Sequence, residues 1–171
     1  MTRWLTIEEQ AVWRAWLVAS SMMKERLAGD LETATELTDE EYGLLVQLSE
    51  AEGRRLRMSS LAALGLHSRS RLSHSISRLV EKGWVTKHPC DTDRRGSWAA
   101  LTRSGFEALE AAAPIHIQSV REHLLDPLTP NQVTQLGQIC TALAEHLCSI
   151  EGADTEVALR VMGGPAPEPA E

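Results

Sequence analysis

The chain has 171 residues, of which 43% are hydrophobic, and a formal net charge of −7, so it is long enough to bury the core of one domain. It contains no run of about 18 apolar residues, and Glu8 and Glu9 interrupt any apolar leader, which argues against a transmembrane helix or a signal peptide. The three cysteines are odd in number and lack metal-ligand spacing, which argues against a disulfide framework and a zinc ribbon. We therefore expect an intracellular, cytoplasmic protein.

The basic residues are concentrated in one part of the chain. Between Gly53 and Arg103 there are eleven lysines and arginines but three acids, a net charge of +8, while the remainder is acidic. A concentrated basic segment attracts phosphate and releases counterions. On charge alone, the segment could bind nucleic acid or could form an ordinary solvated charged surface. The residue pattern within the segment has to distinguish these two interpretations.

The first two predicted elements are helices. Thr6-Ile7-Glu8-Glu9 has the form of a capping box, and the helix that it opens is expected to end at Gly29 in a left-handed conformation. Thr38-Asp39-Glu40-Glu41 repeats the signature and predicts a second helix, which should end near Gly53.

A short strand and a short helix are expected next. Leu56-Arg57-Met58 fits an edge strand, after which Ser59 or Ser60 could cap a helix over residues 61–64. Gly65 then marks a turn.

The following segment, from Ser68 to Gly83, predicts a helix with an unusual polar face. Its apolar face is formed by Leu72, Ile76, Leu79 and Val80. Its other face carries hydroxyl, imidazole and guanidinium side chains: Arg69, Ser70, Arg71, Ser73, His74, Ser75, Ser77 and Arg78. Serine is a mediocre helix former, but short hydroxyls and long guanidinium groups suit the DNA major groove and its flanking phosphates. The two helices and their turn therefore predict a helix-turn-helix.

A β-hairpin with a basic tip should follow the second of these helices. Trp84–His88 and Ser97–Leu101 are rich in strand formers and can pair across residues 89–96. An arginine on such a hairpin can enter the minor groove beside the helix. The hairpin is therefore predicted to be a wing.

Two further helices complete the prediction. Thr102 should cap a long helix that extends past Leu124 and bends at Pro114. Thr129-Pro130-Asn131-Gln132 supplies the N-cap, a proline at the first helical position and the capping glutamine of a last helix. Residues 163–171, rich in glycine and proline, are expected to be disordered. The predicted fold class is mainly α with a small β-hairpin wing.

Several of these motifs together resemble the multiple-antibiotic-resistance regulator (MarR) family. The motifs are the stretch Gly65–Val85, with a mild departure at Val80, the wing tip Asp91–Arg95 and the run Leu101–Gly105. The order of helices over residues 6–150 is also similar to that family.

The resemblance implies a homodimer that binds a pseudo-palindromic operator in double-stranded DNA. Residues 1–35 and 104–152 would form the dimerisation region and residues 36–103 the winged helix-turn-helix, in a cytoplasmic protein associated with the nucleoid when bound. The implied DNA-binding residues are Ser59, Ser60, His67, Ser68, Arg69, Ser70, Arg71, Ser73, His74, Ser77, Arg78, Lys87, Arg94 and Arg95. Asp93 would support the wing by bracing Arg95.

The resemblance also implies a repressor that responds to a small aromatic or phenolic effector. Trp13, Trp16, Met23 and Tyr42 are candidates for its pocket, with ordinary core or dimer-interface packing as the alternative. A thiol-based redox sensor is another alternative, for which Cys90 is a better candidate than Cys140 or Cys148, which are expected to pack in the dimer core.

Other classes of function fit the sequence less well. His116 and His123 lack a compelling set of further metal ligands, so neither a metal site nor a cofactor is expected. The chain has no phosphate-binding loop, nucleophile elbow or paired-carboxylate motif, which argues against an enzyme. A winged-helix protein-interaction module without DNA binding remains an alternative. Such a module would be expected to lose the cations of the helix face and wing tip, which this chain keeps: Arg69, Arg71, Arg78, Arg94 and Arg95.

Overall fold

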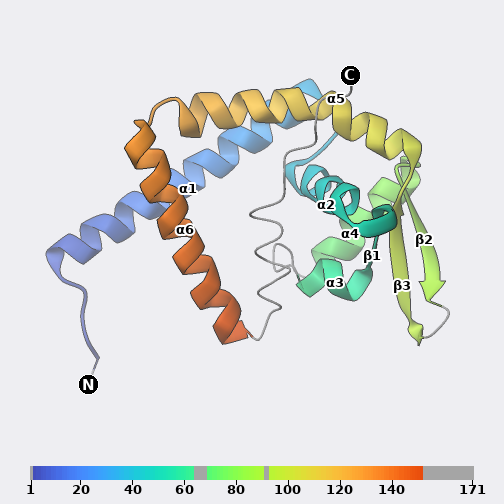
Figure 1. The fold of residues 1–171 in the computed structure, drawn as a ribbon, viewed down its shortest axis with the longest axis horizontal. Helices are drawn as coiled ribbons and strands as arrows, with labels where there is room; N and C mark the ends of the chain where they lie inside the picture. Colours follow the sequence, from blue (N-terminus) through green and yellow to red (C-terminus); the bar gives the residue numbers. More distant parts are fainter. Residues whose placement is uncertain (1, 64–68, 91–92, 152–171) are drawn as a thin grey trace.

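The computed structural model describes residues 2–63, 69–90 and 93–151, which form a mainly helical fold with a small antiparallel sheet (Figure 1). The elements in chain order are α1 (Ile7–Ala34), α2 (Asp39–Glu50), the 3₁₀ turn η1 (Glu52–Arg54), β1 (Arg55–Arg57), α3 (Met58–Ala63), α4 (Arg69–Glu81), β2 (Val85–Cys90), β3 (Asp93–Leu101), α5 (Arg103–Val120), the π-helical turn η2 (Arg121–Leu125) and α6 (Pro130–Glu151). Within the described ranges, no helix is long and apolar enough to cross a membrane. The predicted fold class is confirmed.

Both N-terminal helices begin with the predicted capping boxes. In α1 the amide of Glu9 donates to Thr6 Oγ1 at 3.2 Å, and the amide of Thr6 donates to Glu9 Oε2 at 2.7 Å. In α2 the amide of Glu41 donates to Thr38 Oγ1 at 3.2 Å, and the amide of Thr38 donates to Glu41 Oε2 at 3.1 Å. These reciprocal bonds satisfy amides that lack partners in the first helical turn.

The predicted end of the first helix is wrong, whereas the second helix ends near Gly53 as expected. The first helix continues through Gly29 to Ala34, because its one buried side chain, Leu31, lies beyond the glycine and packs into the core. The amide of Thr35 bonds to the carbonyl of Leu31 at 2.9 Å and closes the helix there. The second helix ends at Glu50, and Gly53, with a φ of 63°, belongs to the separate turn η1.

The last two helices follow the prediction with one difference. Thr102 caps α5 as expected, and Pro114 lies within that helix without ending it. The α-helical hydrogen bonding stops at Val120, however, and gives way to the π-helical turn η2. The predicted start of α6 is confirmed, because the amide of Thr129 donates to Gln132 Oε1 at 2.9 Å.

The sheet has the strand order β1-β3-β2 and is antiparallel throughout. The predicted edge strand begins at Arg55, one residue earlier than expected, and Met58 starts α3 instead of ending the strand. The hairpin is longer than predicted, because residues assigned to its loop continue the ladder. Pro89 pairs with Ser97, and an irregularity separates that pair from the pairing of Cys90 with Asp93.

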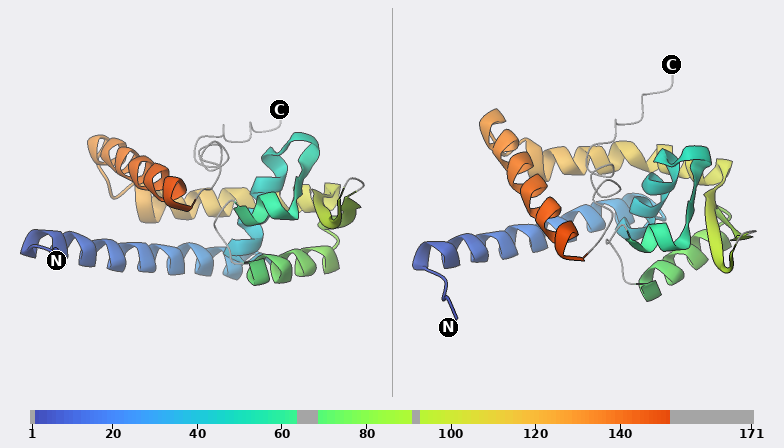
Figure 2. Two further views of the ribbon diagram at one scale, coloured as in Figure 1. Left: turned by 90° about the horizontal axis from the view of Figure 1, so that it is seen from below. Right: turned by 60° about the horizontal axis from the view of Figure 1, so that its bottom comes forward.

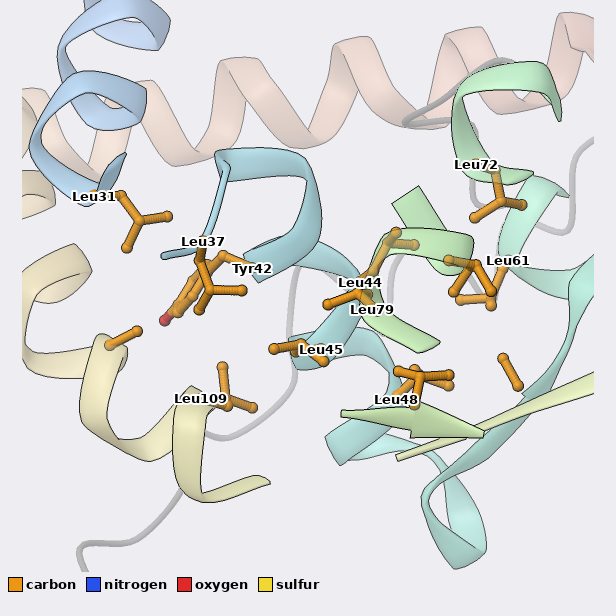
Figure 3. Close-up of a cluster of buried hydrophobic side chains, with 14 residues drawn as sticks. Leu31, Leu37, Tyr42, Leu44, Leu45, Leu48, Leu61, Leu72, Leu79 and Leu109 are labelled. Atoms are coloured by element: carbon orange, nitrogen blue, oxygen red, sulfur yellow. The ribbon is translucent and has the colours of Figure 1, made fainter. Parts of the chain in front are cut away.

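The hydrophobic core is centred on α2 and lies between that helix, the sheet and the helices around it (Figure 3). Leu44, Leu45 and Leu48 of α2 are fully buried, and burial of a leucine side chain contributes roughly 1.5–3 kcal/mol. Around them pack leucines from the end of α1, from α3, α4 and α5, including Leu31 and Leu109. This core fixes the orientation of α4 relative to the sheet.

The rest of the molecule extends away from this core. Helix α5 runs along α1 (Figure 1). At one end of α5 lies the winged lobe, formed by α2, α3, α4 and the sheet, and at the other end lies α6 (Figure 1). The left view of Figure 2 shows α6 separated from α1 along most of its length. The large exposed apolar side chains gather on the first half of α1 and on α6: Ile7, Val12, Trp13, Trp16, Leu17, Val18, Met22, Ile139, Leu143, Leu147 and Ile150.

Candidate nucleic-acid interface

Helix α4 occupies the position of the second helix of a helix-turn-helix and ends as predicted. Gly83 has a φ of 73°, a conformation that glycine adopts without a Cβ penalty. The amide of Gly83 donates to the carbonyl of Val80 at 3.0 Å, and the amide of Trp84 donates to the carbonyl of Leu79 at 2.9 Å. This pair of bonds is a Schellman motif, and it directs the chain from α4 into β2.

The apolar and polar faces of α4 differ from the prediction at two residues. Leu72, Ile76 and Leu79 are buried as expected, but Val80 is 40% exposed and Ser75 is buried. The buried residues therefore follow the spacing i, i+3, i+4, i+7, with Ser75 at the second position. Val80 lies at the edge of this buried face and is partly exposed. Ser75 is buried and therefore does not belong to the candidate DNA surface.

The outward face of α4 carries the polar side chains that the sequence placed there. Ser70, Arg71, Ser73, His74 and Ser77 are all exposed. The hydroxyl of Ser77 donates to the carbonyl of Ser73 at 2.9 Å, a hydrogen bond within the helix itself. Arg69 begins the helix, but its side chain, like His67 and Ser68 as a whole, lies outside the described part of the structure.

Arg78 lies on a flank of α4, where it contacts the buried carboxylate of Glu41. Its Nε lies 3.0 Å from Glu41 Oε1, and 54% of its side chain remains exposed. Glu41 is fully buried, and its Oε2 also accepts from Lys82 Nζ at 3.1 Å. Arg78 therefore holds α4 against α2, a role that the sequence analysis missed because it joins residues far apart in the chain.

The two serines before α4 are placed differently from the prediction. Ser59 and Ser60 lie in the first turn of α3, which begins at Met58, so neither is its N-cap. The helix starts earlier because the strand that precedes it ends at Arg57, where Arg57 pairs with Trp98. Ser59 is exposed and Ser60 is half-buried.

The hairpin carries the remaining candidate residues. Lys87 is exposed on β2, opposite Ala99. Arg94 and Arg95 lie in the first half of β3, where the sequence had placed a loop. The side chains of Asp93, Arg94 and Arg95 lie outside the described part of the structure, so the bracing of Arg95 by Asp93 stays a prediction.

The base of the hairpin is joined to α5 by a dense set of hydrogen bonds. Thr102 Oγ1 accepts from the amide of Gly105 at 3.0 Å and donates to the carbonyl of Gly83 at 2.8 Å. The amide of Thr102 donates to the carbonyl of Trp84 at 3.0 Å. A Cβ on Gly105 would lie 2.1 Å from that carbonyl oxygen, so this contact requires the glycine of the Leu-Thr-x-x-Gly sequence.

Two arginines on the edge strand were counted in the basic segment but not assigned a role. The guanidinium groups of Arg55 and Arg57 lie 5.1 and 5.3 Å from the ring centroid of Trp98, at cation–π distance. The alternation of Arg55 and Arg57 opposite a tryptophan in a paired strand is the signal that could have predicted the contact.

The four candidate effector residues do not line one cavity. Trp13 and Trp16 line an open, apolar groove of about 780 Å³ between α1 and α6, together with Cys140, Leu143 and Leu147. Met23 and Tyr42 are not part of its lining: Met23 is half-buried further along α1, and Tyr42 is buried in the core.

Two histidines that were considered as metal ligands make other contacts, and two of the three cysteines are free thiols. His116 packs against the ring of Tyr42 at 4.5 Å between centroids, and burial lowers its pKa. His123 Nε2 lies 3.0 Å from Asp30 Oδ2. Cys140 and Cys148 are half-buried free thiols on α6, whereas the side chain of Cys90 lies outside the described residues. Among the described residues no cluster of three or more His, Cys, Asp or Glu could hold a metal ion.

Comparison with known proteins identifies the family. A sequence profile of the MarR family matches residues 35–96. Sco3205 from Streptomyces coelicolor, a MarR family transcriptional regulator solved in complex with DNA, is 44% identical to this chain. That similarity covers 86% of this chain and 92% of Sco3205, with a TM-score of 0.81. The chain belongs to the MarR family of transcriptional regulators.

Other MarR family relatives agree with this assignment. AbsC, also from Streptomyces coelicolor, is 43% identical over 86% of this chain and 99% of AbsC, with a TM-score of 0.78. The HTH-type transcriptional regulator PecS from Dickeya dadantii (strain 3937) is 28% identical over 78 residues, which is 46% of this chain and 46% of PecS. The chain thus matches about half the length of that curated relative. All three relatives are transcriptional regulators.

Proposed function

We propose that this MarR family protein binds double-stranded DNA as a homodimer and acts as a repressor without enzymatic activity, in the cytoplasm. The observation that carries the proposal is the outward face of α4, on which Ser70, Ser73, His74 and Ser77 are exposed, with Arg71 and Arg78 along one flank. The face has no acid before Glu81. Exposed donors on a helix beside a basic hairpin suit a major groove and its phosphates.

The proposed DNA contacts come from two parts of the fold, helix α4 and the wing. The outer face of α4 would contact bases, and its arginines would contact phosphates. Arg95 would enter the minor groove from the wing, braced by Asp93. The full set proposed for DNA binding is Ser59, Ser60, His67, Ser68, Arg69, Ser70, Arg71, Ser73, His74, Ser77, Arg78, Lys87, Arg94 and Arg95.

A second copy of this chain would cover the apolar side chains of α1 and α6. Trp13 and Trp16 are about half exposed, and Leu143 and Leu147 face the same groove. Apolar surface of this extent is unusual on a monomer and is typical of an interface. Two-fold symmetry of the dimer would require a pseudo-palindromic operator with one half-site for each lobe.

Repression would be relieved by a small aromatic effector bound beside Trp13 and Trp16. Aromatic rings and an apolar lining offer such a compound stacking and burial, which supports the proposal. Because the groove lies between α1 and α6, its occupation would change the spacing of the two lobes and therefore the affinity for DNA. Titration of candidate phenolic compounds, followed by tryptophan fluorescence and DNA affinity together, tests this part.

The DNA-binding proposal is tested by fluorescence anisotropy with DNA from upstream of the protein's own gene. The expected result is tight binding that a scrambled duplex does not show, with a steep salt dependence. Arg95→Ala should weaken binding by about tenfold if the wing contacts DNA through a charged group. Equal affinity for the two duplexes, together with failure of a genome-wide selection to enrich any site, would contradict the proposal and favour a protein-interaction module.

A further inference from the structure

Glu41 is a fully buried carboxylate that joins the start of α2 to the second half of α4. Its backbone amide and its Oε2 atom complete the capping box with Thr38. The same carboxylate is contacted by two cations of α4, Arg78 and Lys82. A capping box needs neither cation, so the burial of this charge beside both of them calls for an explanation beyond capping.

The two cations are held in different ways. Lys82 Nζ donates to Glu41 Oε2 at 3.1 Å and to the carbonyl of Glu36 at 2.5 Å, and it lies 4.8 Å from the ring centroid of Trp84. Its side chain is 24% exposed. Lys82 is therefore committed to contacts within the lobe.

Arg78 contacts Glu41 through one nitrogen and stays at the surface. The nitrogen is Nε, 3.0 Å from Glu41 Oε1, and 54% of the arginine side chain is exposed. A guanidinium group has five N–H donors in a planar fork, so an ion pair at Nε leaves donors for a second anion. Lysine, a single point charge, lacks this second set of donors at a fixed angle.

The charges and the helix geometry favour a phosphate as that second anion. One carboxylate and two cations leave a net charge of +1, and Lys82, the less exposed cation, is the one that balances Glu41. Arg78 lies seven residues after Arg71, which places both arginines on one flank of α4, about 10.5 Å apart along its axis. A row of cations along one flank of a helix in the major groove meets the phosphates that border the groove.

We propose that Glu41 is a positioning residue that orients the guanidinium group of Arg78 toward a DNA phosphate. The inference rests on the proposed DNA-binding function. Glu41 would contribute to DNA binding through Arg78 and would not itself contact DNA. By attracting the guanidinium group through this ion pair, Glu41 restricts the conformations of Arg78 before DNA binds, and so lowers the entropy that Arg78 loses on binding. Lys82 neutralises Glu41, so that the carboxylate orients Arg78 without cancelling its charge.

A double-mutant cycle tests the proposal, with DNA affinity measured by anisotropy across a salt series. Arg78→Ala should weaken binding by about tenfold and reduce the slope of log K against log salt by about 0.9, the effect of one lost phosphate contact. Glu41→Gln, which keeps an oxygen for the capping box, should weaken binding by roughly threefold in the wild-type background, since only the orientation of Arg78 is lost. In the Arg78→Ala background the same change should leave affinity unaltered.

Glu107→Gln is the matched control, because it removes an acid from an exposed ion pair with Arg103 on α5. It should leave DNA affinity the same in both backgrounds. Arg78→Lys adds a measurement that does not depend on the folding of the Glu41 variant: it should retain most of the salt slope but bind more weakly than the wild type.

The outcomes separate the inference from the function on which it rests. If Glu41→Gln weakens binding equally with and without Arg78, Glu41 acts through the stability of the lobe and the inference is overturned. An unchanged salt slope in Arg78→Ala overturns it as well. Both results would leave the DNA-binding proposal standing, whereas a wild-type protein without selective affinity for any duplex would overturn that proposal together with the inference.

Discussion

The winged lobe and the other end of the molecule, formed by the first half of α1 and by α6, differ in how far they bury their apolar side chains. In the lobe, α2 buries Leu44, Leu45 and Leu48 completely within one chain. In α1, all of whose residues are described, Leu31 is the one buried side chain, while Trp13 and its neighbours remain exposed. The lobe therefore buries its core within a single chain, whereas the other end leaves apolar side chains exposed that the proposed dimer would cover.

The largest expected effect is on the core of the lobe. Leu48→Ala should lower the free energy of unfolding by about 3 kcal/mol, because the cavity forms where the surrounding helices and sheet cannot collapse. Urea unfolding followed by circular dichroism measures it. Val80→Ala, at an exposed position of the same lobe, should cost less than about 1 kcal/mol. Similar losses for the two variants would show that the core is not centred on α2.

The second prediction concerns the exposed end. The double change Leu143→Glu and Leu147→Glu on α6 should raise the dissociation constant of the dimer at least 100-fold, equivalent to about 2.7 kcal/mol, because four carboxylates would have to be buried in the interface. Light scattering after size-exclusion chromatography measures the shift to monomer. The lobe should keep its secondary structure. A variant that remains dimeric would place the interface elsewhere.

A smaller effect is expected where the lobe meets α5. Gly105→Ala should lower the free energy of unfolding by roughly 2 kcal/mol, since the new methyl group would overlap the carbonyl oxygen of Trp84. Gly43→Ala, in the middle of α2, is the control: a Cβ there would meet nothing within 4 Å. That change should raise stability by up to about 1 kcal/mol, because alanine favours helix. Thermal or urea unfolding measures the free energy of unfolding of both variants. A change of the same sign in the two variants would contradict the packing described for Gly105.

The smallest prediction is a pH dependence. Burial lowers the pKa of His116, and the nearby charge of Asp39 opposes that shift in part. The folded chain therefore binds a proton at His116 less readily than the unfolded chain, whose ordinary pKa is 6.5. Stability from this residue is complete above pH 6.5 and is lost as the pH falls from there through the folded pKa. His116→Phe should flatten that decline; parallel pH profiles of the two proteins would exclude His116 as its source.

Features set by neighbouring residues could be predicted from the sequence. The capping boxes at Thr6 and Thr38 and the glycine turn at Gly83 were predicted because their bonds join residues within one helical turn of each other. The end of the first helix was not predicted. Its position depends on Leu31, which reaches a core assembled from α2 and α5.

The candidate site shows the same division. The polar face of α4 followed from helical spacing, but the exchange of Ser75 and Val80 between inside and outside depends on the shape of the packed neighbours. The contact of Glu41 with Arg78 and Lys82 links residues about forty positions apart, so local patterns carried no signal of it.

The most direct test of this account is the stoichiometry of the complex with DNA, measured by sedimentation velocity with a fluorescent duplex that contains the selected site. In the proposed dimer, each chain contributes one complete lobe, and α1 and α6 join the two chains. This arrangement therefore predicts two chains on each duplex, and loss of the complex in the Leu143→Glu, Leu147→Glu variant at the same concentration. A stable complex with one chain on each duplex, unaffected by those changes, would contradict it.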